Sequence, residues 1–330
     1  MTAPLLSVEG LRIETTGRKP AALIEDVSFT LARGETLALV GESGAGKSLS
    51  AMALLGLLPA DAIRVTGGRI VLGGEDITHA APRRLRQIRG GAAAMIFQDP
   101  LSCLNPVLTV GRQIMESLKL HKGLTGAAAR ARAIELLELV RIPEAAKRLD
   151  EYPHRLSGGM RQRVMIAIAL AGEPGLLLAD EPTTALDVTI SAQIMTLLDQ
   201  LRADIGLAIL LITHDLPAVR MIADRVAVMY SGRIVETGGA DAIFAAPAHP
   251  YTRGLLSARP QGAMAAGAPR LTEIPGTVPQ PSDRPSGCAF RPRCPAATAL
   301  CAAERPAVRP LGDGRVACHH AGTAIIQGAA

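Results

Sequence analysis

The chain has 330 residues, of which 48% are apolar and 2% aromatic, and its formal net charge is +5. This length and apolar content suit one large domain with an appended region, or two modest domains, and exclude a globally disordered chain. Basic and acidic residues are interspersed, so the chain lacks the concentrated basic stripe expected of a nucleic-acid partner. The one arginine cluster is interpreted as a solvated helix face and comprises Arg83, Arg84, Arg86 and Arg89.

Membrane insertion is not expected from the sequence. No apolar run approaches the ~18–20 residues that a membrane-spanning helix needs. Residues 1–10 lack a basic start followed by an apolar stretch, so no signal peptide is expected. We therefore expect the chain in the cytoplasm, with any membrane association coming through partner proteins.

The N-terminal part of the chain carries the pattern that opens a nucleotide-binding domain. Residues 5–33 alternate apolar and polar side chains, as edge β-structure does, and residues 36–40 form a compact apolar strand. A glycine-rich turn follows, and then a helical stretch over residues 47–58. A strand, a glycine loop and a helix in this order predict an α/β fold of the nucleotide-binding kind.

The middle of the chain alternates short apolar strands with helical stretches. The predicted strands cover residues 92–97, 176–179 and 208–213, and the predicted helices cover 127–140, 160–171, 191–202 and 216–223. This alternation predicts a largely parallel sheet covered on both faces. After about residue 245 proline and glycine become dense and periodicity fades. The change predicts one domain over residues 1–245 and a separate C-terminal extension over residues 246–330.

Residues 41–48 match the phosphate-binding pattern G-x-x-x-x-G-K-[ST], with the required strand before it and helix after it. The glycines let backbone N–H groups converge on the β-phosphate, and the helix N-terminus adds its positive dipole. Lys47 would bridge phosphate oxygens, and Ser48 would ligate Mg²⁺. The residues predicted to surround the nucleotide are Gly41, Glu42, Ser43, Gly44, Ala45, Gly46, Lys47 and Ser48.

The predicted strand at 176–179 ends in two carboxylates, Asp180 and Glu181. A doubly wound sheet places its ligand at such strand ends. Asp180 can therefore hold Mg²⁺, and Glu181 can polarise the attacking water as a general base. An acidic turn after a strand would explain this segment alone, but its pairing with the glycine loop favours a site that hydrolyses ATP.

A second glycine-rich loop precedes a helix and contains Ser157, Gly158, Gly159 and Met160. Serine and two glycines at a helix start form another anion site, although one nucleotide needs only one phosphate cradle. We therefore predict that this loop closes on ATP held by another subunit. An ordinary N-capped helix would explain Ser157 but not the paired glycines.

This second loop resembles the signature sequence of ABC ATPases, with Met160 where glutamine is usual. Gln98 resembles the Q-loop, Asp187 lies in a segment like the D-loop, and His214 after a strand resembles the switch histidine. The resemblance covers the predicted ATPase domain and implies a P-loop ABC ATPase fold with a helical subdomain. It also implies that Gln98 serves the Mg²⁺ site, and that Gln98 and His214 assist Glu181 in catalysis, His214 as the γ-phosphate sensor.

The chain departs from the ABC pattern at the adenine ring. ABC ATPases usually stack adenine on an aromatic residue upstream of the phosphate loop, but no aromatic residue precedes Phe29, which lies in an apolar strand pattern. Spacing puts Arg18 at the stacking position, where its guanidinium could stack on the base. A solvated loop arginine is an equal alternative.

Further segments resemble the ATPases of oligopeptide and dipeptide importers. They are residues 98–106, residues 160–167, and a tail containing 249–256, 274–276 and a cysteine-rich stretch. The resemblance implies peptide import, with nickel, glutathione or opine import by the same machinery as alternatives. A non-transport ABC ATPase acting on ribosomes or DNA is the alternative of another class, but the sequence lacks the second ATPase unit or long coiled-coil insertion typical of those proteins.

Four of the five cysteines fall in the last 43 residues, namely Cys288, Cys294, Cys301 and Cys318. In a reducing cytoplasm such clustering indicates a metal site rather than disulfides. The spacings of five, six and sixteen residues do not decide between Zn²⁺ and an iron–sulfur cluster. Resemblance to peptide-importer ATPases favours a [4Fe–4S] cluster. Because the extension follows the complete ATPase motif set, it need not touch the nucleotide, and the isolated Cys103 is interpreted as a loop or packing residue.

The resemblance also implies the partners of the chain. Such a subunit dimerises head-to-tail with a second ABC ATPase, similar but distinct, so that each Mg-ATP lies between one phosphate loop and the opposite signature loop. Closure and hydrolysis would drive two membrane permease subunits, and an extracytoplasmic binding protein would deliver peptide. Residues 98–105 would contact a permease, which would hold the chain at the cytoplasmic face of the inner membrane.

Overall fold

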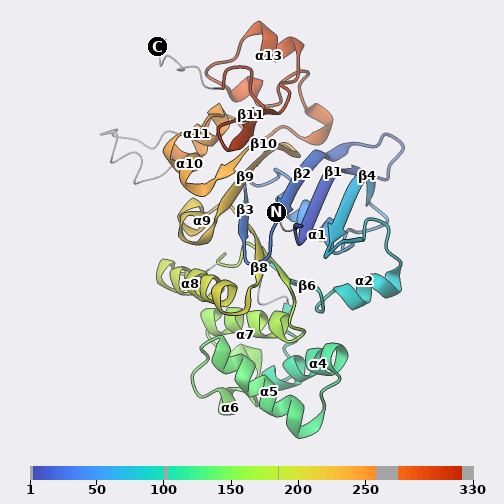
Figure 1. Cartoon of the computed structure of the whole chain (residues 1–330), viewed down its shortest axis with the longest axis vertical. Helices are drawn as coiled ribbons and strands as arrows, with labels where there is room; N and C mark the ends of the chain where they lie inside the picture. Colours follow the sequence, from blue (N-terminus) through green and yellow to red (C-terminus); the bar gives the residue numbers. More distant parts are fainter. Residues whose placement is uncertain (1–2, 100–102, 185, 258–273, 322–330) are drawn as a thin grey trace.

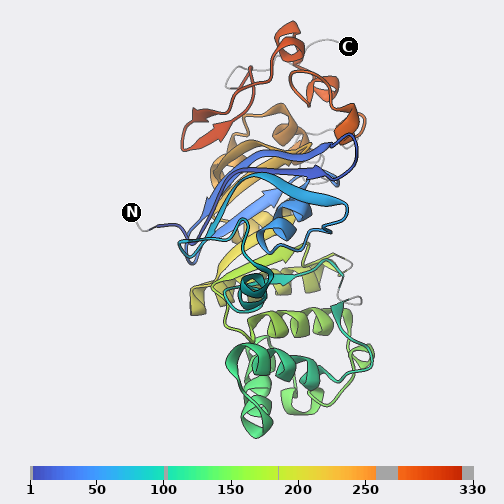
Figure 2. The same cartoon turned by 90° about the vertical axis from the view of Figure 1, so that its right-hand side faces the viewer.

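The computed structural model describes residues 3–99, 103–184, 186–257 and 274–321. Two sheets occupy the middle of the molecule, while a helical part and the C-terminal region lie at opposite ends of its long axis (Figures 1 and 2). Within these described ranges, no helix is long and apolar enough to cross a membrane.

The larger sheet has eight strands in the order β11-β12-β10-β9-β3-β8-β7-β6. Its parallel centre consists of β9 (Arg225–Tyr230), β3 (Thr36–Val40), β8 (Ala208–Thr213), β7 (Leu176–Asp180) and β6 (Ala93–Ile96). Strands β3, β7 and β8 are buried along their whole length, as expected when both faces of a parallel sheet are covered. The predicted alternating α/β part is therefore confirmed.

A second, antiparallel sheet lies over one face of the larger sheet. Its order is β2-β1-β4-β5, formed by β1 (Leu6–Thr15), β2 (Ala22–Leu31), β4 (Ile63–Leu72) and β5 (Glu75–Asp76). Strands β1 and β2 pair antiparallel and account for the alternation predicted over residues 5–33. Alternation showed that these residues would be half-buried strands, but not that they would form a sheet of their own.

The two faces of the parallel strands contribute to two different hydrophobic cores. In β8, Ile209 and Leu211 belong to a core shared with the helices, whereas Leu210 and Ile212 belong to a core shared with the antiparallel sheet. Successive side chains of a strand point to opposite faces, so an unbroken apolar strand supplies both cores. The strand backbone between the two cores is thereby fixed, and so is the position of the loop at its end.

Helices α1 (Lys47–Leu54), α2 (Pro82–Ile88), α8 (Val188–Ile205), α9 (Leu216–Ile222) and α10 (Ala240–Ala245) connect the strands. The predicted helix over 47–58 ends at Leu54, and Gly56 two residues later has a φ of 60°. The predicted helical subdomain is present at one end of Figure 1 as α4 (Val110–Lys122), α5 (Gly126–Leu139), α6 (Ala145–Arg148), η1 (Pro153–Arg155) and α7 (Gly158–Leu170).

The C-terminal region is attached to the larger sheet through a strand pair. Its elements are α11 (Pro250–Ser257), η2 (Pro281–Asp283), η3 (Arg291–Arg293), α13 (Ala299–Ala303), β11 (Arg309–Leu311) and β12 (Gly314–Val316). Strand β12 pairs antiparallel with β10 (Arg233–Gly239), so the hairpin extends the sheet of the ATPase part. The ring centroid of Phe290 lies 5.2 Å from that of Tyr230 and 5.4 Å from that of Tyr251. The region thus shares both a sheet and a core with the preceding chain, which its fading periodicity did not indicate.

Candidate nucleotide-binding site

The phosphate loop connects β3 to α1 as the sequence predicts, and two of its glycines have no substitute. A Cβ atom at Gly41 would lie 2.3 Å from the carbonyl oxygen of Met229, so a side chain there would strike the backbone of β9. Gly46 has a φ of 102°, and a Cβ there would lie 2.3 Å from Ile24 Cδ1. Glycine alone tolerates this left-handed conformation and close approach without strain. These two glycines therefore permit the close packing of the loop against β9 and β2.

Lys47 and Ser48, at the start of α1, meet the strand-end carboxylate Asp180. Lys47 is 5% exposed, and its Nζ donates to the carbonyl oxygens of Gly41 at 2.8 Å and Glu42 at 3.0 Å. Burial lowers the pKa of Lys47, although the charges of Glu181, Asp180 and Glu42 oppose that shift. Ser48 Oγ donates to Asp180 Oδ1 at 2.9 Å. Two of the three predicted Mg²⁺ ligands thus lie together, although they are 132 positions apart in sequence.

Glu181 lies at the centre of a hydrogen-bonded group at the ends of β6, β7 and β8. Gln98 Nε2 donates to Glu181 Oε2 at 2.8 Å, and His214 Nδ1 lies 3.0 Å from Glu181 Oε1. Thr184 Oγ1 also donates to Oε2, at 2.9 Å. Burial raises the pKa of Glu181, but the bonds with His214 and Thr184 and the charges of His214 and Lys47 outweigh it, so the pKa lies below its ordinary value. The structure therefore brings together all three predicted catalytic residues, and Thr184 is an addition.

The signature loop is positioned by neighbours from the following loop and helix. Ser157 Oγ accepts from the backbone N–H of Met160 at 3.3 Å, the contact of an N-cap. A Cβ at Gly159 would lie 2.7 Å from Ile190 Cγ2, so this glycine permits close packing against α8. Asp187 caps α8 in turn, because its Oδ1 accepts from the N–H of Ile190 at 2.8 Å. Among the described residues no hydrogen bond joins this loop to the phosphate loop. Arg18, the residue predicted to stack on adenine, is exposed in the loop between β1 and β2.

The C-terminal region contacts the phosphate loop, which the sequence did not indicate. Arg293 forms two hydrogen bonds with the carboxylate of Glu42, at 2.6 and 2.8 Å. Tyr251 Oη accepts from the N–H of Glu42 at 2.8 Å. These residues lie 251 and 209 positions from Glu42, and no spacing rule connects such distant segments. Sequence reasoning missed both residues, although Tyr251 belongs to the tail motif that pointed to peptide importers.

The four clustered cysteines line one small cavity of about 10 Å³, together with His249, His319 and His320. Cys301 Sγ lies 3.4 Å from His320 Nε2, and Cys318 Sγ accepts from the N–H of His320 at 3.4 Å. Burial raises the pKa of Cys294 to about 11. In the part of the chain that the structure describes, however, no group of three or more His, Cys, Asp or Glu side chains could hold a metal ion. The geometry brings the thiols to one place but does not support the predicted metal site.

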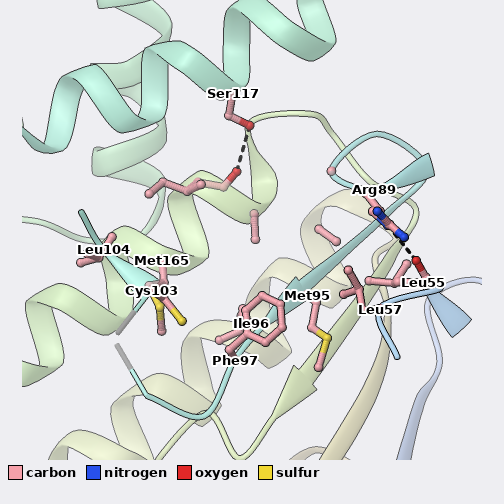
Figure 3. Close-up of a pocket in the computed structure, with 14 residues that line it drawn as sticks. Leu55, Leu57, Arg89, Met95, Ile96, Phe97, Cys103, Leu104, Ser117 and Met165 are labelled. Carbon is pink, nitrogen blue, oxygen red and sulfur yellow. Dashed lines mark hydrogen bonds between the residues drawn. The ribbon is translucent and has the colours of Figure 1, made fainter. Parts of the chain in front are cut away.

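An apolar cavity of about 320 Å³ opens beside β6, the strand that precedes Gln98 (Figure 3). Phe97, which is 41% exposed, lines it with Met95 from β6, and Leu55 and Leu57 line it from the end of α1. Leu104 lines it from the segment before α4, and the helical subdomain contributes Ser117 of α4 and Met165 of α7. Cys103, which is exposed, also lines the cavity. Of the predicted permease segment, residues 98–105, Cys103 and Leu104 line this cavity, and residues 100–102 lie outside the described ranges.

A phosphate loop, a Ser–Asp pair and a strand-end glutamate held by Gln98 and His214 define the site as that of a P-loop ATPase. The family model described as ABC transporter matches residues 24–184, and the model described as oligopeptide/dipeptide transporter, C-terminal region, matches residues 235–301. A peptide import ATP-binding protein of Brucella abortus is 57% identical over 316 residues, covering 95% of this chain and 94% of that one.

Other relatives agree with these matches. The dipeptide transport ATP-binding protein DppD of Escherichia coli is 49% identical over 318 residues, covering 96% of each chain. Among solved structures, the dimeric ATP-binding cassette MJ0796 bound to ADP and Pi is similar, with a TM-score of 0.63 and 27% identity over 71% of this chain and 98% of that one. The chain belongs to the ATP-binding proteins of ABC transporters and is an ATPase of that family, with the C-terminal region of the oligopeptide and dipeptide transporter group. The predicted family and its peptide-importer branch are confirmed.

Proposed function

We propose that this chain hydrolyses ATP to power the import of dipeptides and oligopeptides through partner permease subunits. The observation that carries the proposal is the grouping of Glu181 with Gln98 and His214 beside the phosphate loop. The names of relatives at 57% and 49% identity, which are peptide import and dipeptide transport ATP-binding proteins, support the direction of transport and the class of substrate.

The strand-end residues divide the hydrolytic step between them. Glu181 accepts a proton from the attacking water, and its lowered pKa keeps the carboxylate ionised for that role. Gln98 and His214 hold the carboxylate in place and would orient the water and sense the γ-phosphate. Lys47 leaves its bonds to the loop carbonyls to contact phosphate oxygens, as a lysine of this loop does in other P-loop ATPases.

The residues present fit the Mg²⁺ that accompanies ATP. Ser48 and Asp180 place a hydroxyl and a carboxylate oxygen 2.9 Å apart at the start of α1, and such oxygens are the ligands that Mg²⁺ prefers. Gln98 lies at the same strand ends and would complete the set. When bound, Mg²⁺ neutralises charge that develops on the phosphate oxygens.

The signature loop is proposed to act on a second ATPase subunit. Residues 157–160 begin α7 with an N-terminus that can meet an anion, and within this chain they pack on α8. A head-to-tail dimer would bring this loop to the partner's nucleotide, with Asp187 at the dimer contact. The dimeric state of the similar MJ0796 cassette supports this arrangement, and we propose a similar but distinct ATPase as the partner.

The apolar cavity beside Phe97 is proposed to receive a cytoplasmic segment of a permease (Figure 3). Its lining residue Phe97 directly precedes Gln98 in the chain, and Gln98 contacts Glu181, so a movement of the permease segment would reach Glu181 through this short connection. Through this contact the chain would sit at the cytoplasmic face of the inner membrane. An extracytoplasmic binding protein would deliver peptide to the permeases.

The region after residue 245 is proposed as a transporter-specific extension that carries a [4Fe–4S] cluster, with Zn²⁺ as the alternative. Four thiols around one cavity are suitable donors, but binding requires them to move from the described arrangement, in which no three could share a metal ion. No step of ATP hydrolysis depends on the cluster, whose role would be structural.

Arg18 is proposed to stack on the adenine ring, which the exposure of its loop permits. Replacing it with alanine should then weaken binding of ATP several-fold and leave binding of a triphosphate without a base unchanged. Equal losses for both ligands would show that Arg18 responds to phosphate charge instead.

Glu181→Gln tests the hydrolytic role. The amide keeps the shape of the side chain but cannot accept a proton, so ATP binding should persist while turnover falls by about 100-fold or more. Steady-state ATPase activity of the assembled transporter and equilibrium binding of Mg-ATP measure the two effects, and Lys47→Ala should weaken binding itself. A Glu181→Gln transporter that keeps most of its turnover would exclude Glu181 as the base.

A further inference from the structure

The C-terminal region contacts Glu42 of the phosphate loop at two groups, and Lys47 of the loop itself contacts a third. The Glu42 carboxylate accepts two hydrogen bonds from Arg293, its N–H is bound by Tyr251 Oη, and its carbonyl oxygen accepts from Lys47 Nζ. The Arg293 side chain is 5% exposed and is itself fixed, since its Nε donates to the carbonyl oxygen of Pro275 at 2.8 Å. Two-bond arginine–carboxylate pairs are among the stronger and more directional contacts in proteins.

The charge of Glu42 is unfavourable where it stands. Glu42 is the second residue of a loop whose purpose is to bind phosphate, and its charge acts on Lys47 closely enough to oppose the lowering of the lysine pKa. An uncompensated carboxylate at this place would repel the phosphate groups of ATP. Arg293 supplies the compensating positive charge from a segment outside the ATPase motifs.

We propose that Arg293 is a positioning residue for ATP binding, which neutralises Glu42 and holds its peptide so that the phosphate loop accepts the nucleotide. The proposal goes beyond the hydrolytic function and rests only on residues 41–48 being the ATP site. It makes the C-terminal region a part of that site. The similar cassette MJ0796 is matched over 98% of its own length by 71% of this chain.

A double-mutant cycle in the full-length, assembled transporter tests the proposal. Arg293→Ala should raise the KM for ATP about tenfold, since it leaves a charged partner unpaired, while kcat changes by less than about twofold. Glu42→Gln alone serves as the reference variant, because its phosphate loop lacks the repelling charge. Combining the two should restore the KM to within about threefold of Glu42→Gln, because the repelling charge is gone. Arg293→Lys, which keeps the charge without the two-bond geometry, should give an intermediate KM.

Arg284→Ala is the matched control. Arg284 is another buried arginine of the same region, 11% exposed, but it pairs with Glu25 of β2 instead of the phosphate loop. Its loss should lower thermal stability as much as Arg293→Ala does and leave the KM for ATP near wild type. Equal KM changes in both variants, or a double mutant no better than Arg293→Ala, would overturn the proposal. Lys47→Ala tests the ATP site separately, since undiminished ATP binding in that variant would refute the site and not the role of Arg293.

Discussion

The nucleotide site and the cysteine-lined cavity both gather residues that are distant in sequence, but they are built differently. At the nucleotide site, Glu181, Gln98 and His214 each follow a strand of one parallel sheet, and parallel strands deliver their ends to the same edge. Around the cavity, Cys301 lies on the short helix α13, whereas the other three cysteines lie in irregular segments outside the helices and strands. In a parallel sheet, residues that follow neighbouring strands lie close together at one edge. Residues in irregular segments come close only through the particular packing of those segments. The sequence could therefore predict that Glu181, Gln98 and His214 lie together, but not how the four thiols are arranged.

The largest expected effect tests whether the nucleotide site is shared between two subunits. The cysteine-lined cavity, in contrast, is lined by residues of this chain. Ser157→Arg should abolish hydrolysis of ATP held by the partner ATPase, lowering it about 100-fold or more, because the bulky side chain obstructs the anion site at the start of α7. Turnover counted separately at each of the two sites of the mixed transporter provides the measurement. Loss confined to the phosphate loop of this chain would contradict a site shared between subunits.

The cysteine cavity should respond to substitution independently of the nucleotide site. Anaerobically purified protein is expected to be brown, and replacing any one of Cys288, Cys294, Cys301 or Cys318 with serine should bleach it and expose the C-terminal region to protease. Cys103→Ser, the matched control outside the cavity, should do neither. Metal analysis and limited proteolysis distinguish the outcomes. Colourless protein with stoichiometric zinc would exclude the cluster but keep the site, and metal-free protein with four reactive thiols would exclude both.

A smaller effect sharpens the description of the nucleotide site. Thr184→Val removes one hydrogen bond that lowers the pKa of Glu181, so that pKa should rise. A base works above its pKa and fails as pH falls through it, so the acidic limb of the kcat profile should move to higher pH. A kcat loss of about two- to fivefold at neutral pH is expected from one such bond. Thr184→Ser, which keeps the hydroxyl, should retain the wild-type profile, and an unshifted limb in Thr184→Val would show that the threonine only supports the turn.

The sequence did not indicate how the chain before residue 245 and the chain after it would pack together. The fading periodicity after residue 245 suited a separate extension, yet β12 pairs with β10 and Phe290 packs against Tyr230. A three-residue strand such as β12 has too few residues to show a period, and its pairing partner is chosen by what the rest of the fold leaves exposed. The domain boundary near residue 245 therefore remains a prediction.

The sequence by itself determined the ATPase site, because each of its parts is local. The glycine loop needs particular backbone conformations, the carboxylates need the end of an apolar strand, and both requirements appear as short, readable patterns. Only the tertiary structure decided that Arg293 and Tyr251 hold Glu42, that Thr184 holds Glu181, and that four thiols share a cavity without forming a metal ligand set. These contacts depend on how irregular segments pack against the finished sheet, and packing between distant segments leaves no periodic trace in the chain.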